Sequence, residues 1–165
     1  SPAELNRMRL RVPNVPLFVD TWTALGAQPT PMAFSEVFTS LQNGTIGGQE
    51  NPLALIQAAS LNEVQSHVNQ TEHVRSWIYL TIAEQVWQRL SQEDQAHVLE
   101  AARIAQEFER EQFLQDEDAI RADLEAKGMT FVEVDQKAFA DCSRDAVINS
   151  VDESIRPIVQ DLFNH

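Results

Sequence analysis

The fold follows from residues 8–59, which read MRLRVPNVPLFVDTWTALGAQPTPMAFSEVFTSLQNGTIGGQENPLALIQAA. Apolar and basic side chains alternate over Met8–Val12, which predicts a strand with one apolar face, and Pro13 ends it. Apolar side chains then recur at helical spacing over Pro16–Leu25, and Gly26 is placed to close that helix. The segment therefore begins as a strand followed by a crossover helix.

The same alternation continues to residue 59. A short strand over Pro29–Ala33 precedes a helix over Ser35–Leu41, and a strand over Thr45–Glu50 precedes a helix over Leu53–Ala59. Strands that alternate with helices argue for a parallel sheet with crossover helices. We therefore expect an α/β fold.

The rest of the chain predicts more strands and one long helix. We expect two strands within residues 64–82, a short helix over Ala83–Leu90, a strand over Met129–Val134 and two helices after it. Residues 92–127 hold neither Gly nor Pro and are rich in helix formers. A helix of that length extends about 54 Å, which is longer than the diameter of a compact globule of 165 residues. Because its apolar stripe slips in phase, we expect a kink near residues 110–116.

Composition excludes several functions. The chain has 12 Lys and Arg residues and 25 Asp and Glu residues. The resulting net charge of −13 argues against nucleic acid as a partner. The single cysteine, Cys142, which we expect to be buried, excludes an internal disulfide. No apolar run reaches about 18 residues, the length that spans a bilayer. Residues 91–128 carry 11 acidic and 4 basic side chains, typical of a solvated helix face.

Enzyme templates are nearly absent. The sequence has no Gly-x-Ser-x-Gly elbow, no phosphate loop and no pair of histidines at metal-ligand helix spacing. We therefore expect no catalytic residue, no metal and no cofactor. A carboxylate-processing enzyme remains a weak alternative, because no acid–base pair or nucleophile is evident.

Three side chains form a candidate binding site. Ligands of open parallel sheets bind outside the carboxyl ends of the strands, where Arg11 lies. A guanidinium there can bind a carboxylate through two parallel hydrogen bonds, although a surface Arg11 paired with an acid is an equally open reading. Asn51 lies at the matching end of the third strand, and Phe34 could form an apolar wall or belong to the core.

The motifs of this region resemble a known family. They are LRVPN at 10–14, LGAQPTPMAFSEVFTSLQNG at 25–44, GGQENPL at 47–53, EVQSHVNQTEHV at 63–74, VWQRLSQEDQ at 86–95 and LEAKGMTFVEVD at 124–135. In order and spacing they are similar to the solute-binding proteins of tripartite ATP-independent periplasmic (TRAP) transporters, the DctP-like family.

The resemblance implies a type II periplasmic-binding-protein-like lobe with a mostly parallel sheet, crossover helices and one long helix that spans two lobes. It implies a periplasmic protein that binds a carboxylate-bearing organic acid and delivers it to a membrane permease. The family's ligand-binding arginine matches Arg11, its motif asparagine matches Asn51, and its aromatic side chain matches Phe34. We add Asn14 of the first motif and Trp77 of the following segment to the expected ligand-binding set.

Two departures from the family matter. Gly47 replaces a common aspartate, and the resemblance covers only the C-terminal half of a family member. We expect residues 1–74 to form the first part of the C-terminal lobe, 75–127 to cross between lobes, and 128–165 to return, with the N-terminal lobe missing. The ligand, a C4-dicarboxylate or a sugar acid, stays open. The alternative is a truncated lobe that folds or dimerises, through the face left uncovered, but binds no ligand alone.

Overall fold

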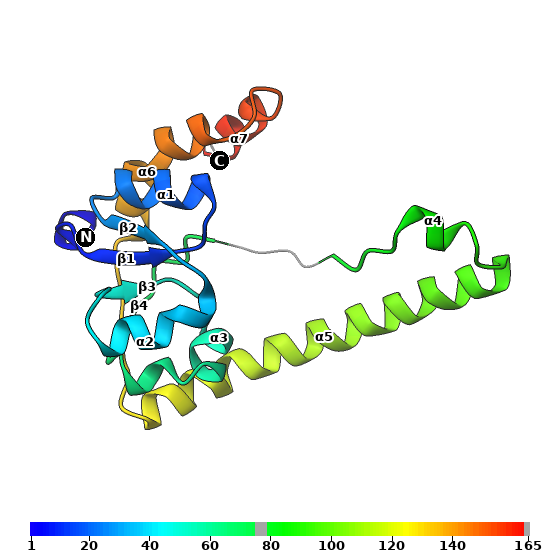
Figure 1. Ribbon diagram of the computed structural model, residues 1–165, viewed down its shortest axis with the longest axis horizontal. Coiled ribbons are helices and arrows are strands. Elements are labelled where there is room, and N and C mark those ends of the chain that lie inside the picture. The colour runs from blue at the N-terminus through cyan, green and yellow to red at the C-terminus, as the bar shows by residue number, and fades with distance from the viewer. Residues whose placement is uncertain (75–78, 164–165) are drawn as a thin grey trace. The chain divides into compact units, whose positions relative to one another are not determined.

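The computed structural model describes the chain except for residues 75–78 and 164–165 (Figure 1). The expected ligand contact of Trp77 lies outside the described residues. The chain divides into two compact units. Unit 1 comprises Ser1–His73 and Leu124–His165, and unit 2 comprises Val74–Asp123.

Unit 1 contains the predicted parallel sheet. Its strands are β1 (Arg9–Val12), β2 (Gln28–Pro31) and β3 (Gly48–Gln49), in the order β2-β1-β3. Helix α1 (Pro16–Ala24) joins β1 to β2, and α2 (Val37–Gln42) precedes β3. Helix α3 (Leu53–Ala58) follows β3, and 3-10 turns form at Pro2–Leu5, Phe34–Glu36 and Leu61–Glu63. The strand predicted over residues 45–50 is shorter than expected.

A second, two-stranded sheet connects distant parts of unit 1. Strand β4 (His67–Asn69) pairs in parallel with β5 (Thr130–Val132), and helices α6 (Gln136–Ser150) and α7 (Arg156–Leu162) follow. Only one strand, not two, lies among the described residues of 64–82. Tyr79 and Leu80 are 78% and 73% exposed, and neither residue lies in a strand.

One hydrophobic core cluster of unit 1 lies on one face of the main sheet. Leu10 and Val12 of β1 pack with Trp22 of α1 and Phe139 of α6, so both helices cover this face. Strand alternation places Arg9 and Arg11 on the other face. Cys142 of α6 was expected to be buried but is exposed, because Phe139, Ser143 and Ile148 occupy the buried positions of this helix.

Unit 2 contains α4 (Glu84–Trp87) and most of α5 (Gln92–Ala126). Ser91 caps α5 as predicted, because its Oγ accepts a hydrogen bond from the Asp94 amide at 3.1 Å. The kink expected near 110–116 is wrong: α5 is one uninterrupted helix, as its lack of Gly and Pro permits (Figure 1). Among the residues described, no helix combines the length and the apolarity that a membrane span requires.

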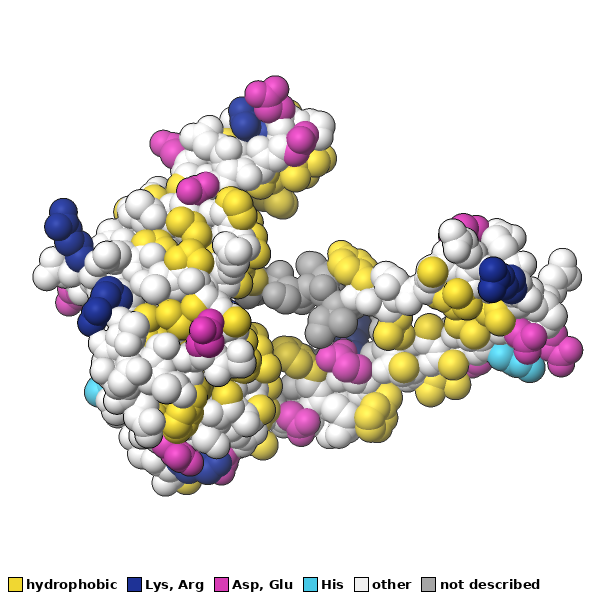
Figure 2. Space-filling view, viewed as in Figure 1, with side chains coloured by type: hydrophobic (Ala, Val, Ile, Leu, Met, Phe, Trp, Pro, Cys, Tyr) yellow, Lys and Arg dark blue, Asp and Glu magenta, His cyan; other side chains and the backbone are white. Residues whose placement is uncertain are grey.

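Several apolar side chains in the unit 2 part of α5 are exposed rather than packed. Figure 2 shows them as yellow patches between acidic side chains. Leu99, Ile104, Phe108 and Phe113 are 62%, 54%, 65% and 55% exposed. Within residues 74–123, none of the described side chains is fully buried. The described residues of unit 2 therefore form no core, in contrast to those of unit 1.

Candidate functional site

Arg11 is the buried charge around which the candidate site is built. Arg11 is only 6% exposed and is the next-to-last residue of β1, which ends at Val12. Its Nε and Nη2 atoms both donate hydrogen bonds to the carbonyl oxygen of Met32, at 3.1 and 3.0 Å. Met32 directly follows β2, the parallel neighbour of β1. The guanidinium is therefore fixed at the carboxyl edge of the sheet.

Phe34 lies over the guanidinium of Arg11. The Arg11 Cζ atom is 5.8 Å from the centre of the Phe34 ring, within the range of a cation–π interaction. Phe34 is 39% exposed, so it is not a core residue and presents part of its ring to solvent. The structure brings these two predicted site residues together, which makes Phe34 available as an apolar wall beside the charge.

A chain of three amides lies beside Arg11. Gln49 of β3 is the ladder partner of Arg11 of β1, so the two side chains share a sheet face. Asn51 Nδ2 donates a hydrogen bond to Gln49 Oε1 at 2.6 Å, and Gln49 Nε2 donates to Gln65 Oε1 at 3.2 Å. The predicted Asn51 thus lies at the same sheet edge as Arg11, held by two glutamines that the sequence analysis did not single out.

Glu50 supplies a negative charge near Arg11. Burial lowers the pKa of Arg11, and the nearby charge of Glu50 opposes this by raising that pKa. The Glu50 side chain is only 12% exposed, and its Oε2 lies 3.3 Å from Nε2 of His73. On the other side of the imidazole ring, Nδ1 lies 2.7 Å from the Thr71 hydroxyl. The site is therefore a mixed-charge cluster and not an isolated cation.

Sequence reasoning overlooked Glu50 and left His73 unassigned. The available signal was position, because Glu50 stands between Gln49 and Asn51 at the end of β3. The pairing of Glu50 with His73 could not be read from the sequence, since the two residues are 23 positions apart and meet only in the folded chain. The ring of Trp22 meets the His73 ring edge-on at 5.0 Å, which links the cluster to the core.

Two other sequence features lie differently. Asn14 is exposed in the loop between β1 and α1, and its expected ligand contact stays a prediction. At Gly47, an added Cβ would come within 3.3 Å of the Met8 Cγ atom. Because Met8 is a flexible side chain, a larger residue at position 47 would need only a small shift there.

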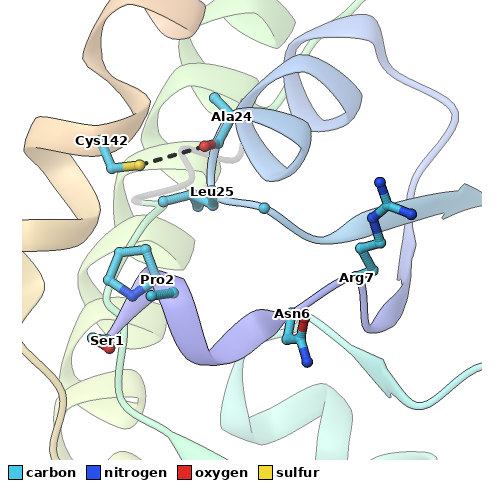
Figure 3. A pocket seen from close by; sticks show the side chains of 9 residues that line it. Ser1, Pro2, Asn6, Arg7, Ala24, Leu25 and Cys142 are labelled. Carbon is cyan, nitrogen blue, oxygen red and sulfur yellow. Dashed lines mark hydrogen bonds between the residues drawn. The ribbon is translucent and has the colours of Figure 1, made fainter.

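A separate hollow lies at the other end of unit 1, near the N-terminal turn (Figure 3). It is lined by Ser1, Pro2, Asn6, Arg7, Ala24, Leu25 and Cys142, among others. The Cys142 thiol donates to the carbonyl oxygen of Ala24 at 3.4 Å. Of the predicted ligand-binding residues that the structure describes, none lines this hollow.

Comparison with known proteins gives a consistent result. The DctP family model, described as bacterial extracellular solute-binding protein, family 7, matches residues 1–156. A solute-binding protein of Roseobacter denitrificans is 66% identical over 164 residues, covering 99% of this chain and 50% of that protein. The 2,3-diketo-L-gulonate-binding periplasmic protein YiaO of Escherichia coli is 31% identical over 142 residues, covering 86% and 43%.

Solved structures agree with the fold. A TRAP periplasmic solute-binding protein of Roseobacter denitrificans with bound L-galactonate superposes with a TM-score of 0.91 at 66% identity, covering 99% of this chain and 54% of the other. A second one, with bound 3-deoxy-D-manno-oct-2-ulosonic acid, gives 0.87 at 34% identity, covering 98% and 55%. The α/β fold predicted from the sequence is thereby confirmed. The chain spans about half the length of these relatives.

Proposed function

The chain belongs to the DctP family of bacterial extracellular solute-binding proteins. We propose that it forms a ligand-binding part of the solute-binding subunit of a TRAP transporter. The subunit captures a sugar acid in the periplasm and delivers it to the membrane permease. The chain acts by binding alone, and no bond of the ligand is made or broken.

The observation that supports this proposal most is the buried and oriented Arg11. Two of its donors are held by the Met32 carbonyl oxygen, which fixes the plane of the guanidinium. Within the described part of the chain, Nη1 of Arg11 donates no hydrogen bond. A fixed guanidinium with free N–H groups matches a carboxylate in geometry and charge. In this role Arg11 anchors the carboxylate, Asn51 orients the ligand and Phe34 shields it from water.

A sugar acid fits better than a C4-dicarboxylate. The solved relatives hold L-galactonate and 3-deoxy-D-manno-oct-2-ulosonic acid, both of which carry one carboxylate and several hydroxyls. Arg11 is the only buried cation among the described residues, which suits one carboxylate. The neighbouring Asn51 is a neutral amide, which suits a hydroxyl group, and the two glutamines linked to it by hydrogen bonds, Gln49 and Gln65, add no charge.

Calorimetric titration with L-galactonate tests the proposal. It is carried out on the 165-residue chain and on a protein that joins this chain to the part of the Roseobacter denitrificans relative that it does not cover. We expect Arg11→Ala to abolish binding in whichever form binds. Arg11→Lys should weaken binding by about 10-fold or more, because an ammonium loses the fork that the Met32 carbonyl orients.

Arg9→Lys is the matched control. Arg9 lies on the same strand and is exposed, with Nη2 donating to the Gly44 carbonyl oxygen at 2.8 Å. This change should alter affinity less than about threefold. Binding that survives Arg11→Ala, or the absence of binding to any organic acid by the joined protein, contradicts the proposed function.

The second candidate is a lobe that binds no ligand alone and instead dimerises. It is favoured by the exposed apolar side chains of α5, such as Phe108 and Phe113. Sedimentation velocity over a hundredfold range of concentration tests it. A constant monomer mass excludes the dimer, and a dimer that no acid stabilises replaces the first proposal for the 165-residue chain.

A further inference from the structure

The amide chain of Asn51, Gln49 and Gln65 has a consequence for ligand choice. Resting on the proposed function, we propose that Gln65 and Gln49 are positioning residues that hold the Asn51 amide with Oδ1 as an acceptor for a ligand hydroxyl. This arrangement favours hydroxylated monocarboxylates over dicarboxylates.

The first step of the argument is the direction of the hydrogen bonds. Gln65 Oε1 accepts from Gln49 Nε2 at 3.2 Å, so the other end of the Gln49 amide, Oε1, remains to accept from Asn51 Nδ2 at 2.6 Å. The amide plane of Asn51 is thus held with Nδ2 toward Gln49. Its Oδ1 atom lies on the opposite side of the planar group and stays available as an acceptor.

The second step is the anchor of this chain. The backbone amide of Gln65 donates to the carbonyl oxygen of Leu61 at 2.9 Å, and Leu61 is fully buried. Gln49 is fixed as the β3 ladder partner of Arg11. Both glutamines are therefore held by the core and the sheet, so they can orient Asn51 without touching the ligand themselves.

The third step is the chemistry that the oriented amide accepts. A hydroxyl group can donate to Asn51 Oδ1, whereas a carboxylate cannot, because both groups would present lone pairs. A second carboxylate would also approach the Glu50 charge, which acts on Arg11 in the same cluster. Arg11 is the one buried cation of the described residues, so a second carboxylate finds no matching charge among them.

Substitution of Gln65 tests the proposal without altering a residue that touches the ligand. Gln65→Met removes the acceptor at similar volume, and Gln65→Glu keeps an acceptor for Gln49 Nε2. Gln42→Met is the matched control, because it makes the same chemical change at an exposed position of α2.

The first measurement needs no ligand. Hydrogen exchange of the Asn51 Nδ2 protons is followed by NMR in the 165-residue chain, with the signals assigned by their loss in Asn51→Ser. We expect Gln65→Met to speed this exchange about fivefold, the factor that corresponds to a hydrogen bond worth about 1 kcal/mol. Gln65→Glu and Gln42→Met should leave the rate within about twofold. Unchanged exchange in Gln65→Met overturns the proposal.

The second measurement is the ratio of the affinities for L-galactonate and adipate, a dicarboxylate of the same carbon number without hydroxyls. It is made in the form that binds acids, either this chain or the joined protein. We expect Gln65→Met to lower the preference for L-galactonate about tenfold and Gln65→Glu to retain it. An equal loss for both acids, or failure of Gln65→Glu to rescue, overturns the proposal. If neither form binds any acid, the proposed function fails, and the exchange measurement alone decides whether Gln65 and Gln49 position Asn51.

Discussion

Among single residues, Glu50 has the clearest energetic role. It is nearly buried, it offsets the cost of burying Arg11, and its carboxylate lies 3.3 Å from His73. A buried charge whose partner is removed keeps its desolvation cost without compensation. The charge of Glu50 therefore contributes to stability as well as to the electrostatics of the site.

We predict that Glu50→Gln lowers the free energy of unfolding by about 1 to 3 kcal/mol, because Arg11 then stays buried without the nearby negative charge. Urea denaturation measures the change. Glu63→Gln, at an exposed position, is the control and should have an effect within about 0.5 kcal/mol. Equal effects of the two changes would contradict the role given to Glu50.

Asp152 offers a prediction on pH. The Ser154 hydroxyl and then the Ser154 backbone amide donate to its carboxylate, at 2.6 and 2.8 Å, which lowers the pKa of Asp152. A carboxyl whose pKa is lower in the folded chain than in the unfolded chain stabilises the fold at pH values above its ordinary pKa of about 3.9. This stabilisation is lost as the pH falls through the pKa of the folded chain.

NMR titration of the carboxyl carbons should therefore find the midpoint of Asp152 below that ordinary value. We expect Ser154→Ala to move the midpoint back up, because the substitution removes the Ser154 hydroxyl, whose hydrogen bond is the largest cause of the lowered pKa. Ser35→Ala, at an exposed position elsewhere, should leave it unchanged. An unchanged midpoint in Ser154→Ala would show that other groups set the pKa of Asp152.

Among the elements, α5 shows how local sequence and packing separate. Its 35 residues form one helix because Gly and Pro are absent and helix formers dominate. The same sequence suggested a kink, since its apolar side chains change phase, but a phase change alone breaks no backbone hydrogen bond. Such a shift indicates which sides of a helix are apolar and does not by itself predict a bend.

Shortening a leucine side chain to alanine should have different effects at two positions of α5. Leu124 is fully buried in unit 1, whereas Leu99 is 62% exposed. We predict that Leu124→Ala lowers the free energy of unfolding by about 2 to 5 kcal/mol through the cavity it leaves. Leu99→Ala is the control on the same helix and should change it by less than about 0.5 kcal/mol. A large effect of Leu99→Ala would mean that a partner covers this side chain.

At the scale of the whole molecule, the two units differ in what holds them. Unit 1 has a core built on Leu10, Val12, Trp22 and Phe139. The described residues of unit 2 include no fully buried side chain. Helices in proteins gain most of their stability from packing of an apolar face, so α5 within unit 2 depends mainly on its own propensity.

Hydrogen exchange of the backbone should report this difference. We predict that amides of residues 98–113 exchange at least about tenfold faster than amides near Trp22 in α1. Amides in the middle of α6 serve as a helical control and should be protected like those of α1. Comparable protection in residues 98–113 would instead indicate that another surface covers them, and sedimentation velocity would show whether it belongs to a second copy.

The local sequence was sufficient to identify the strands and helices of residues 8–59, the long helix and the positions of Arg11, Phe34 and Asn51 at the edge of the sheet. These features depend on side-chain periodicity, prolines and glycines, which act over a few residues. The pairing of Glu50 with His73, the amide chain to Gln65 and the exposure of Cys142 were decided by the tertiary structure. Such contacts join residues that are far apart in the chain or depend on which side of a helix meets the core, and no local pattern encodes either.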